Sequence, residues 1–202
     1  MKKALWFIHG RSGFASEAEH YVPLFKDYDV IGFDYKSRLP WEAAEEFPKE
    51  YRRLTEKYDS VTVVAISIGA YYTLSTLGGE NIKRAFLISP IVDIEKVIRG
   101  MMSMAKVTED ELKEKSIIET DFGETLSWQY YTYVKEHQIK WDIPTDILYG
   151  ENDNFTDLDT MSAFAKKINA DLRVMEGGEH WFHTDEEMAF LDKWINEKTA
   201  AQ

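Results

Sequence analysis

The chain has 202 residues, a length that fits one domain with one sizeable core. It contains no cysteine, which excludes disulfides, thiolate metal sites and a cysteine nucleophile. Its formal net charge of −12 and its lack of basic runs argue against binding to nucleic acid or to an anionic membrane.

Strands and helices alternate in the first half of the chain. Short apolar runs predict strands at residues 4–8, 30–33, 61–66 and 85–88. Amphipathic stretches predict helices at residues 16–26, 42–58 and 67–77. We expect Pro48 to disturb the second of these helices, and Gly78-Gly79 is a typical end for the third.

The segment from about residue 93 to residue 141 interrupts this alternation. It is helix-rich and carries methionine and aromatic side chains that a six-stranded core does not need for its own packing. The alternation then resumes, with strands at residues 146–149 and 172–175 and helices at residues 160–168 and 186–197. We therefore predict a single domain over residues 1–202 with a helical, cap-like insertion at about residues 93–141.

The first apolar run is interrupted by His9 and is shorter than the apolar region of a signal peptide. No stretch reaches the length of a membrane span, so we expect a cytoplasmic protein.

Strands that alternate with helices predict an α/β fold: a doubly wound, mostly parallel six-stranded sheet with helices on both faces. Such sheets bind ligands at the carboxyl ends of their strands. Reactive residue types follow four of the expected strands, with His9-Gly10 after the first, Ser67 after the third, Asp153 after the fifth and His180 after the sixth. These side chains are expected to gather at one edge of the sheet.

A serine, a histidine and an acid in this arrangement suit nucleophilic catalysis. A serine hydroxyl attacks well only when a base takes its proton, and the base needs a partner that fixes its tautomer. Preset N–H donors must also stabilise the oxyanion that develops. In the run Ala65-Ile66-Ser67-Ile68-Gly69, small residues two positions either side of the serine let neighbouring backbones approach a sharp strand-to-helix turn.

These residues resemble the motifs of the α/β-hydrolase family over nearly the whole chain. The matching pieces, in order, are His9-Gly10, the turn around Ser67, Tyr149-Gly150-Glu151-Asn152-Asp153 and Gly177-Gly178-Glu179-His180-Trp181-Phe182. The order Ser, Asp, His is also the order of that family. Ala65 stands where many members have the first glycine of the turn, and the two leading strands of the family have no counterpart.

The resemblance implies roles for these residues and a minimal six-stranded core with strand order 2-1-3-4-5-6. Ser67 would be the nucleophile, His180 the general base and Asp153 the acid that orients it. The backbone N–H groups of Ile68 and Arg11 would form the oxyanion hole.

Each of these assignments has an alternative. Ser67 could be only the N-cap of its helix, and His183 is a second candidate base. The other candidate acids are Asp157, Asp159 and Asp93. The side chain of Arg11 could bind a substrate carboxylate, be exposed or form a salt bridge, while His9 is expected to shape its loop.

No metal or other cofactor is expected. The acidic run at residues 153–159 lacks the glycine that an EF-hand needs at its sixth position, and Phe164 falls where its bidentate glutamate belongs.

The insertion is expected to act as a small lid over an apolar acyl pocket. The residues predicted to contribute to this pocket are His9, Gly10, Trp128, Tyr131 and Trp181. The function predicted is hydrolysis of a small-molecule carboxylic ester with a small or medium acyl group, through an acyl-enzyme on Ser67. A thioesterase, a small peptidase, a C–C bond hydrolase and a non-catalytic binding protein on the same scaffold are the alternatives.

Overall fold

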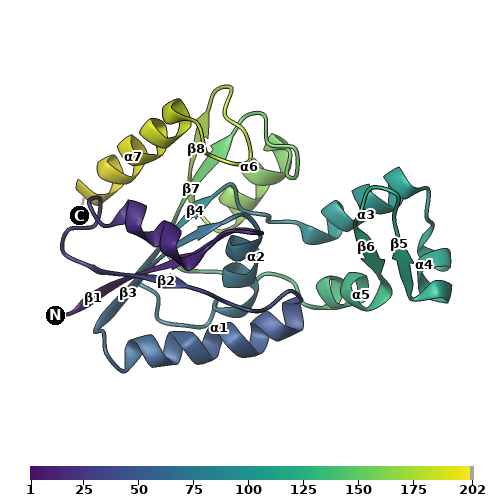
Figure 1. The fold of residues 1–202 in the computed structure, drawn as a ribbon, viewed down its shortest axis with the longest axis horizontal. Helices are drawn as coiled ribbons and strands as arrows, with labels where there is room; N and C mark the ends of the chain where they lie inside the picture. Colours follow the sequence, from purple (N-terminus) through teal and green to yellow (C-terminus); the bar gives the residue numbers. More distant parts are fainter. Residues whose placement is uncertain (201–202) are drawn as a thin grey trace.

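The computed structural model describes residues 1–200, and residues 201–202 of the expected domain lie outside this range. A six-stranded sheet with helices on both faces forms the centre of the molecule, and a smaller group of elements projects from one side of it (Figure 1).

All neighbouring strands in the large sheet are parallel. Their order is β2-β1-β3-β4-β7-β8, which is 2-1-3-4-5-6 when only these six strands are counted, as predicted. The bounds of the six strands are β1 Lys3–Ile8, β2 Asp29–Phe33, β3 Ser60–Ile66, β4 Arg84–Ile88, β7 Thr145–Gly150 and β8 Asp171–Met175.

Successive residues of the central strands pack against opposite layers of helices. In β1, Trp6 and Ile8 belong to one core cluster, and Leu5 and Phe7 belong to another. The first cluster includes residues of α1 (Pro40–Thr55), α2 (Ser67–Thr76) and α6 (Leu158–Lys167). The second includes residues of the 3₁₀ helix η1 (Ala15–Tyr21) and of α7 (Asp185–Ala200). Burial on both faces explains why these strands read as continuous apolar runs rather than as alternating ones.

Two of the expected helices differ in detail from the structure. The helix expected at residues 16–26 is a short 3₁₀ helix that ends at Tyr21, two residues before Pro23, which has no N–H with which to continue it. The helix expected at residues 42–58 begins two residues earlier, with Pro40 in its first turn, where a missing N–H costs nothing. It continues through Pro48, which the sequence analysis expected to disturb it.

The segment between β4 and β7 forms the projecting group. It contains three helices and a pair of short antiparallel strands that the sequence analysis did not anticipate. The bounds are α3 Ile94–Ala105, α4 Glu109–Lys115, β5 Ile117–Glu119, β6 Thr125–Ser127 and α5 Trp128–Glu136. Leu112, Leu126 and Tyr131 are fully or almost fully buried, so this group has well-packed side chains of its own.

Aromatic packing and two ion pairs join the insertion to the sheet and its helices. Trp41 of α1 packs edge-on against Tyr133 of α5, with ring centroids 5.5 Å apart. Lys96 of α3 pairs with Asp157, which precedes α6, at 2.6 Å. Arg11, in the loop after β1, pairs with Glu124, in the turn between β5 and β6, also at 2.6 Å.

Within residues 1–200, none of the helices is both long and apolar enough to cross a membrane. Over the same range, no group of three or more His, Asp or Glu side chains is arranged to hold a metal ion.

Candidate functional site

Ser67 occupies the sharp turn between β3 and α2. Its φ of 52° lies in the left-handed region, which is uncommon and strained for a residue with a side chain and recurs at active sites. The turn places Ser67 at the first position of α2, so the positive end of the helix dipole lies beside its hydroxyl.

The turn is possible because neighbouring backbones approach it closely. A Cβ at Gly69 would overlap the carbonyl oxygen of His9, and a Cβ at Gly10 would lie 3.4 Å from the Cβ of Ser67. The loop after β1 therefore lies directly against the turn that carries the serine hydroxyl.

Ser67, His180 and Asp153 form a continuous hydrogen-bonded chain. The Ser67 Oγ lies 2.8 Å from His180 Nε2, and His180 Nδ1 lies 2.6 Å from Asp153 Oδ2. A carboxylate only accepts hydrogen bonds, so Nδ1 carries the proton and Nε2 is free to accept from the serine hydroxyl. The three residues follow β3, β8 and β7, at the sheet edge where the sequence placed them.

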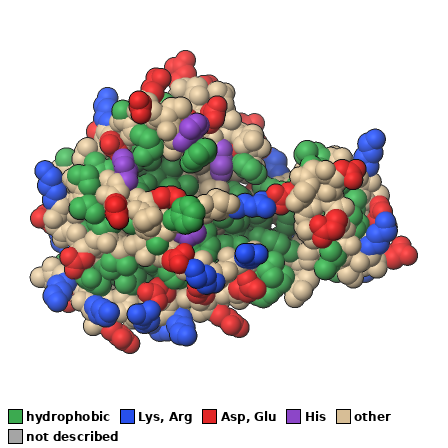
Figure 2. Space-filling model, in the orientation of Figure 1, with side chains coloured by type: hydrophobic (Ala, Val, Ile, Leu, Met, Phe, Trp, Pro, Cys, Tyr) green, Lys and Arg blue, Asp and Glu red, His purple; other side chains and the backbone are tan. Residues whose placement is uncertain are grey.

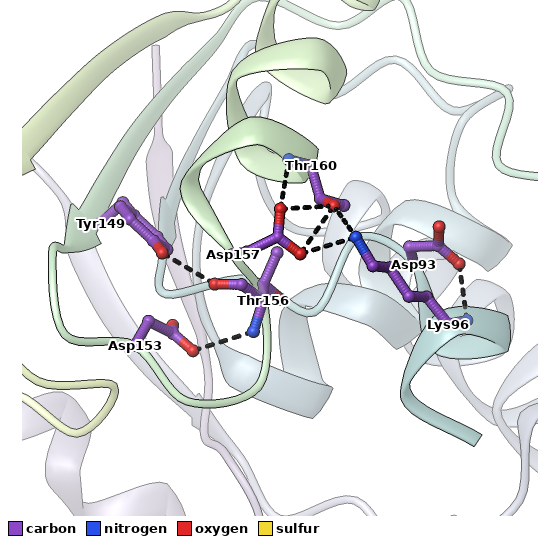
Figure 3. A network of polar contacts seen from close by, with 7 residues as sticks. All are labelled: Asp93, Lys96, Tyr149, Asp153, Thr156, Asp157 and Thr160. Carbon is purple, nitrogen blue, oxygen red and sulfur yellow. Dashed lines mark hydrogen bonds and ion pairs between the residues drawn. The ribbon is translucent and has the colours of Figure 1, made fainter. Parts of the chain in front are cut away.

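Asp153, the acid of this hydrogen-bonded triad, is shielded from solvent, and both of its carboxylate oxygens accept hydrogen bonds. The Asp153 side chain has no exposed surface. Its other oxygen, Oδ1, accepts from the N–H groups of Phe155 at 2.8 Å and Thr156 at 3.1 Å (the contact with Thr156 is drawn in Figure 3). These bonds fix the direction in which Oδ2 faces His180.

The loop that carries the acid and the loop that carries the histidine touch at two glycines. A Cβ at Gly150 would lie 2.6 Å from the carbonyl oxygen of Gly178, and the Asn152 N–H donates to that same oxygen at 2.8 Å. This close contact sets the separation between Asp153 and His180.

Two of the alternative acids, Asp157 and Asp93, are engaged elsewhere (Figure 3). Asp157 caps α6 and pairs with Lys96, and the hydrogen bond from Lys96 holds the pKa of the Asp157 carboxyl well below its usual range. Asp93 caps α3 by accepting from the Lys96 N–H at 2.9 Å. Asp159 lies exposed in the first turn of α6.

The alternative base is also turned away from the serine. His183 Nδ1 lies 2.7 Å from the carbonyl oxygen of Trp181, and the His183 ring stacks on the Trp181 ring with centroids 4.4 Å apart. His180 is therefore the histidine that this structure brings to Ser67.

The loop after β1 holds His9, Gly10 and Arg11 beside the site. The His9 ring is buried and stacks on Tyr35 with centroids 4.4 Å apart, as suits a residue that shapes the loop. The Arg11 guanidinium forms the ion pair with Glu124, which is one of the alternatives left open for it.

The aromatic residues expected at the pocket have different environments. Tyr131 is fully buried inside the insertion, where its hydroxyl accepts from Arg99 Nε and donates to Glu109, so it has no surface to offer a substrate. Trp128 is half-buried and packs against Tyr131. Trp181 is 69% exposed, directly after His180.

A cavity that the sequence analysis missed lies between the loop after β1, the start of α1 and the insertion. Its volume is about 420 Å³. Figure 2 shows a hollow with exposed hydrophobic side chains between the main body and the insertion. The lining residues are Arg11, Leu39, Trp41, Ile117, Gly123, Glu124, Thr125, Ser127, Gln129 and Tyr130. No sequence pattern marks Leu39 and Trp41 as cavity-lining residues, because only the folded topology brings the start of α1 to the insertion.

Glu187 is the other residue near the site that the sequence analysis missed. It is 4% exposed and lies in the first turn of α7. Burial alone raises the pKa of this carboxyl, but hydrogen bonds from the backbone N–H groups of Glu179, Thr184 and His183 outweigh it and lower the pKa to about 2. The spacing Thr184-x-x-Glu187 before the last helix is a capping-box pattern that could have drawn attention to it.

Comparison with solved structures finds the same fold in several α/β-hydrolases. Est1E from Butyrivibrio proteoclasticus gives a TM-score of 0.77 at 19% identity, over 99% of this chain and 88% of Est1E. The alpha/beta hydrolase domain-containing protein 10 from mouse gives 0.70 at 13% identity, over 98% and 90%. An esterase from Pyrococcus furiosus gives 0.63 at 19% identity, over 98% and 80%.

The chain therefore has the α/β-hydrolase fold, as its sequence motifs suggested. No family model matches the sequence, and no curated protein matches it. The fold comparison rests on structure alone, so the chemistry must be argued from the site itself.

Gly69→Ala is expected to lower the free energy of unfolding by about 1–3 kcal/mol, because the new Cβ overlaps the His9 carbonyl oxygen. Urea denaturation measures this change. Gly100→Ala is the matched control: it lies inside α3 with open space around an added Cβ, and should gain about 0.5–1 kcal/mol. Wild-type stability in Gly69→Ala would contradict the close approach of the His9 backbone to Gly69.

Lowering the pH is expected to remove the stabilisation that Glu187 supplies. Its pKa is about 2 in the fold against 4.5 for the unperturbed group, so the stabilisation is complete above about pH 4.5 and is lost as the pH falls towards 2. The shift corresponds to about 3 kcal/mol. The difference in Tm between the wild type and Glu187→Gln, followed by circular dichroism, should shrink below about pH 4.5. A difference that does not change with pH would show that the charge is not involved.

Proposed function

We propose that this protein is a serine hydrolase that cleaves a carboxylic ester of a small or medium acyl group through an acyl-enzyme on Ser67. The observation that carries the proposal is the hydrogen-bonded chain from Ser67 Oγ through the His180 ring to the buried Asp153. A protein that only binds ligands has no need of such a chain, with its strained serine and its oriented histidine.

In the acylation step, His180 Nε2 takes the proton of Ser67 as Oγ attacks the ester carbonyl carbon. The Asp153 carboxylate stabilises the imidazolium that forms. The N–H groups of Ile68 and Arg11 receive the oxyanion, with help from the positive end of α2. The tetrahedral intermediate collapses as the imidazolium gives its proton to the departing alcohol.

In the deacylation step, water attacks the acyl carbon while His180 takes one of its protons. A second tetrahedral intermediate then releases the carboxylic acid and returns the proton to Ser67. Every proton moves through Nε2, and the second oxygen of the acid product comes from water.

The cavity that Arg11 lines is the candidate place for the acyl group, because Gly10, the residue before Arg11, lies against Ser67. A volume of about 420 Å³ lies in the range of ligand pockets and admits a medium-sized acyl chain. The Arg11 charge is already neutralised by Glu124, which favours an uncharged acyl group over a second carboxylate. One structure of Est1E holds ferulic acid, an acid of this size class. The insertion would then serve as a small cap, since it supplies one wall of this cavity.

The alcohol part of the ester would lie on the other side, next to the histidine that protonates it. The Phe155 ring lies 4.6 Å from the His180 ring and is 46% exposed. Trp181, directly after His180, is exposed as well. The exposed Phe155 ring beside the base favours an apolar alcohol.

Ser67→Ala and His180→Ala are each expected to lower kcat by about 10⁴-fold or more on esters of medium acyl chains, because each removes a member of the triad. His183→Ala should keep kcat within a few-fold, since His183 does not reach Ser67. Steady-state hydrolysis of a series of acyl esters and thioesters of rising chain length measures both effects and the acyl preference. Loss of turnover in His183→Ala, with turnover retained in His180→Ala, would overturn the choice of base.

Phe155→Ala is expected to change selectivity for the alcohol. The ratio of kcat/KM for the benzyl ester to that for the methyl ester of the same acid should fall about tenfold, the effect of one lost apolar contact. Phe122→Ala is the matched control, because Phe122 is similarly exposed but lies in the insertion. An unchanged ratio in Phe155→Ala would show that the alcohol part of the ester does not bind beside Phe155.

A further inference from the structure

The loop that carries His180 is held in an unusual way. Residues 179–184 belong to no helix or strand. Within the described residues, no main-chain carbonyl accepts from the N–H groups of this loop. Three of these N–H groups donate instead to one carboxylate, that of Glu187: Glu179 at 2.9 Å, His183 at 3.1 Å and Thr184 at 3.0 Å.

We propose that Glu187 is a positioning residue for the general base, which it holds by binding its loop on both sides. The bond from Glu179 precedes His180 by one residue, and the bonds from His183 and Thr184 follow it by three and four. Both carboxylate oxygens take part, because Glu179 donates to Oε1 and the other two donate to Oε2. This inference rests on the proposed function for the role of His180.

The anchor is rigid because it belongs to a well-packed helix. Leu191, Trp194 and Ile195 of α7 are almost completely buried against the sheet. Phe182 is 7% exposed and packs into the same cluster, so the loop is also held from within. The packing of α7 on the sheet therefore fixes the position of the His180 ring relative to Ser67. A displacement of about 1 Å in such a group can cost about 10²-fold in rate.

A capping role alone does not account for these contacts. Thr184 and Glu187 do form a capping box: the Thr184 hydroxyl accepts from the Glu187 N–H at 3.2 Å, and the carboxylate accepts from the Thr184 N–H. The bonds from Glu179 and His183 lie outside that motif. The Thr184 hydroxyl also donates to Glu187 Oε2 at 2.9 Å. Thr184→Ala therefore removes both contacts of the hydroxyl and leaves the three backbone N–H bonds to the carboxylate, whereas Glu187→Ala removes all of them.

The test compares kcat, KM and Tm in wild type, Glu187→Ala, Glu187→Gln and Thr184→Ala. Glu187→Ala is expected to lower kcat by about 10²-fold with KM changed less than about threefold, because the base is misplaced while the substrate surfaces remain. Thr184→Ala should lower Tm but keep kcat within about threefold. The kcat of Glu187→Gln should lie between those of Glu187→Ala and Thr184→Ala, since the amide of Gln presents only one oxygen to three N–H donors.

A second measurement does not depend on turnover. In wild type, the Nδ1 proton between His180 and Asp153 should give a far-downfield proton NMR signal, and Thr184→Ala should keep it. Glu187→Ala should broaden or lose it. If wild type shows the signal but hydrolyses no ester, the proposed function fails while the positioning of His180 by Glu187 is still decided by the variants.

Two results would overturn the proposal: a folded Glu187→Ala with wild-type kcat and an intact signal, or equal losses of kcat in Glu187→Ala and Thr184→Ala. If Glu187→Ala does not fold, Glu187→Gln decides, because the proposal requires its kcat to lie below that of Thr184→Ala.

Discussion

The hydrogen bond between His180 and the buried Asp153 is the interaction on which the rest of the site depends. It joins two loops that contain no regular structure at the point where they meet. Each loop is held by a carboxylate that accepts from its backbone: Asp153 takes the N–H groups of Phe155 and Thr156, and Glu187 takes those of the histidine loop. The acid side chains thus do in these loops what main-chain carbonyls do in strands and helices.

Glycines complete this arrangement because they let the loops lie in contact. Gly69 admits the backbone of His9 beside the serine turn, and Gly150 admits the backbone of Gly178 beside the acid loop. The first contact brings the expected oxyanion donors to Ser67, and the second brings Asp153 to His180. Any larger residue at these two positions would have to separate the groups whose geometry defines the site.

The insertion is placed mainly by packing rather than by its ion pairs. The pairs of Lys96 with Asp157 and of Arg11 with Glu124 involve exposed side chains, and such pairs contribute about 0–1 kcal/mol each. Across the border, Trp41 of α1 packs edge-on against Tyr130 and Tyr133 of α5. The insertion is therefore a firm wall of the cavity, with polar side chains at its border with the loop after β1.

Sequence patterns predicted the elements whose signal is local. The four central strands, β1, β3, β4 and β7, could be predicted because burial on both faces produces unbroken apolar runs. Ser67, Asp153 and His180 were expected to lie together because parallel strands end at a common edge. The short strands β5 and β6 were missed because three residues are too few to show an alternating pattern. Tyr131 was expected at the pocket because helical spacing does not distinguish the inner face of the insertion from its outer face. The capping-box spacing of Thr184 and Glu187 indicates only a helix start, and no sequence pattern indicates the further bonds from Glu179 and His183.

We propose that Ser67 is a nucleophile activated by this chain of hydrogen bonds. Reaction of the folded protein with a fluorophosphonate, followed by peptide mapping in a mass spectrometer, tests it most directly. We expect one adduct per chain, located on Ser67, and its loss when the protein is unfolded before the reagent is added. An unlabelled folded protein, or equal labelling of Ser67→Ala, would contradict the claim.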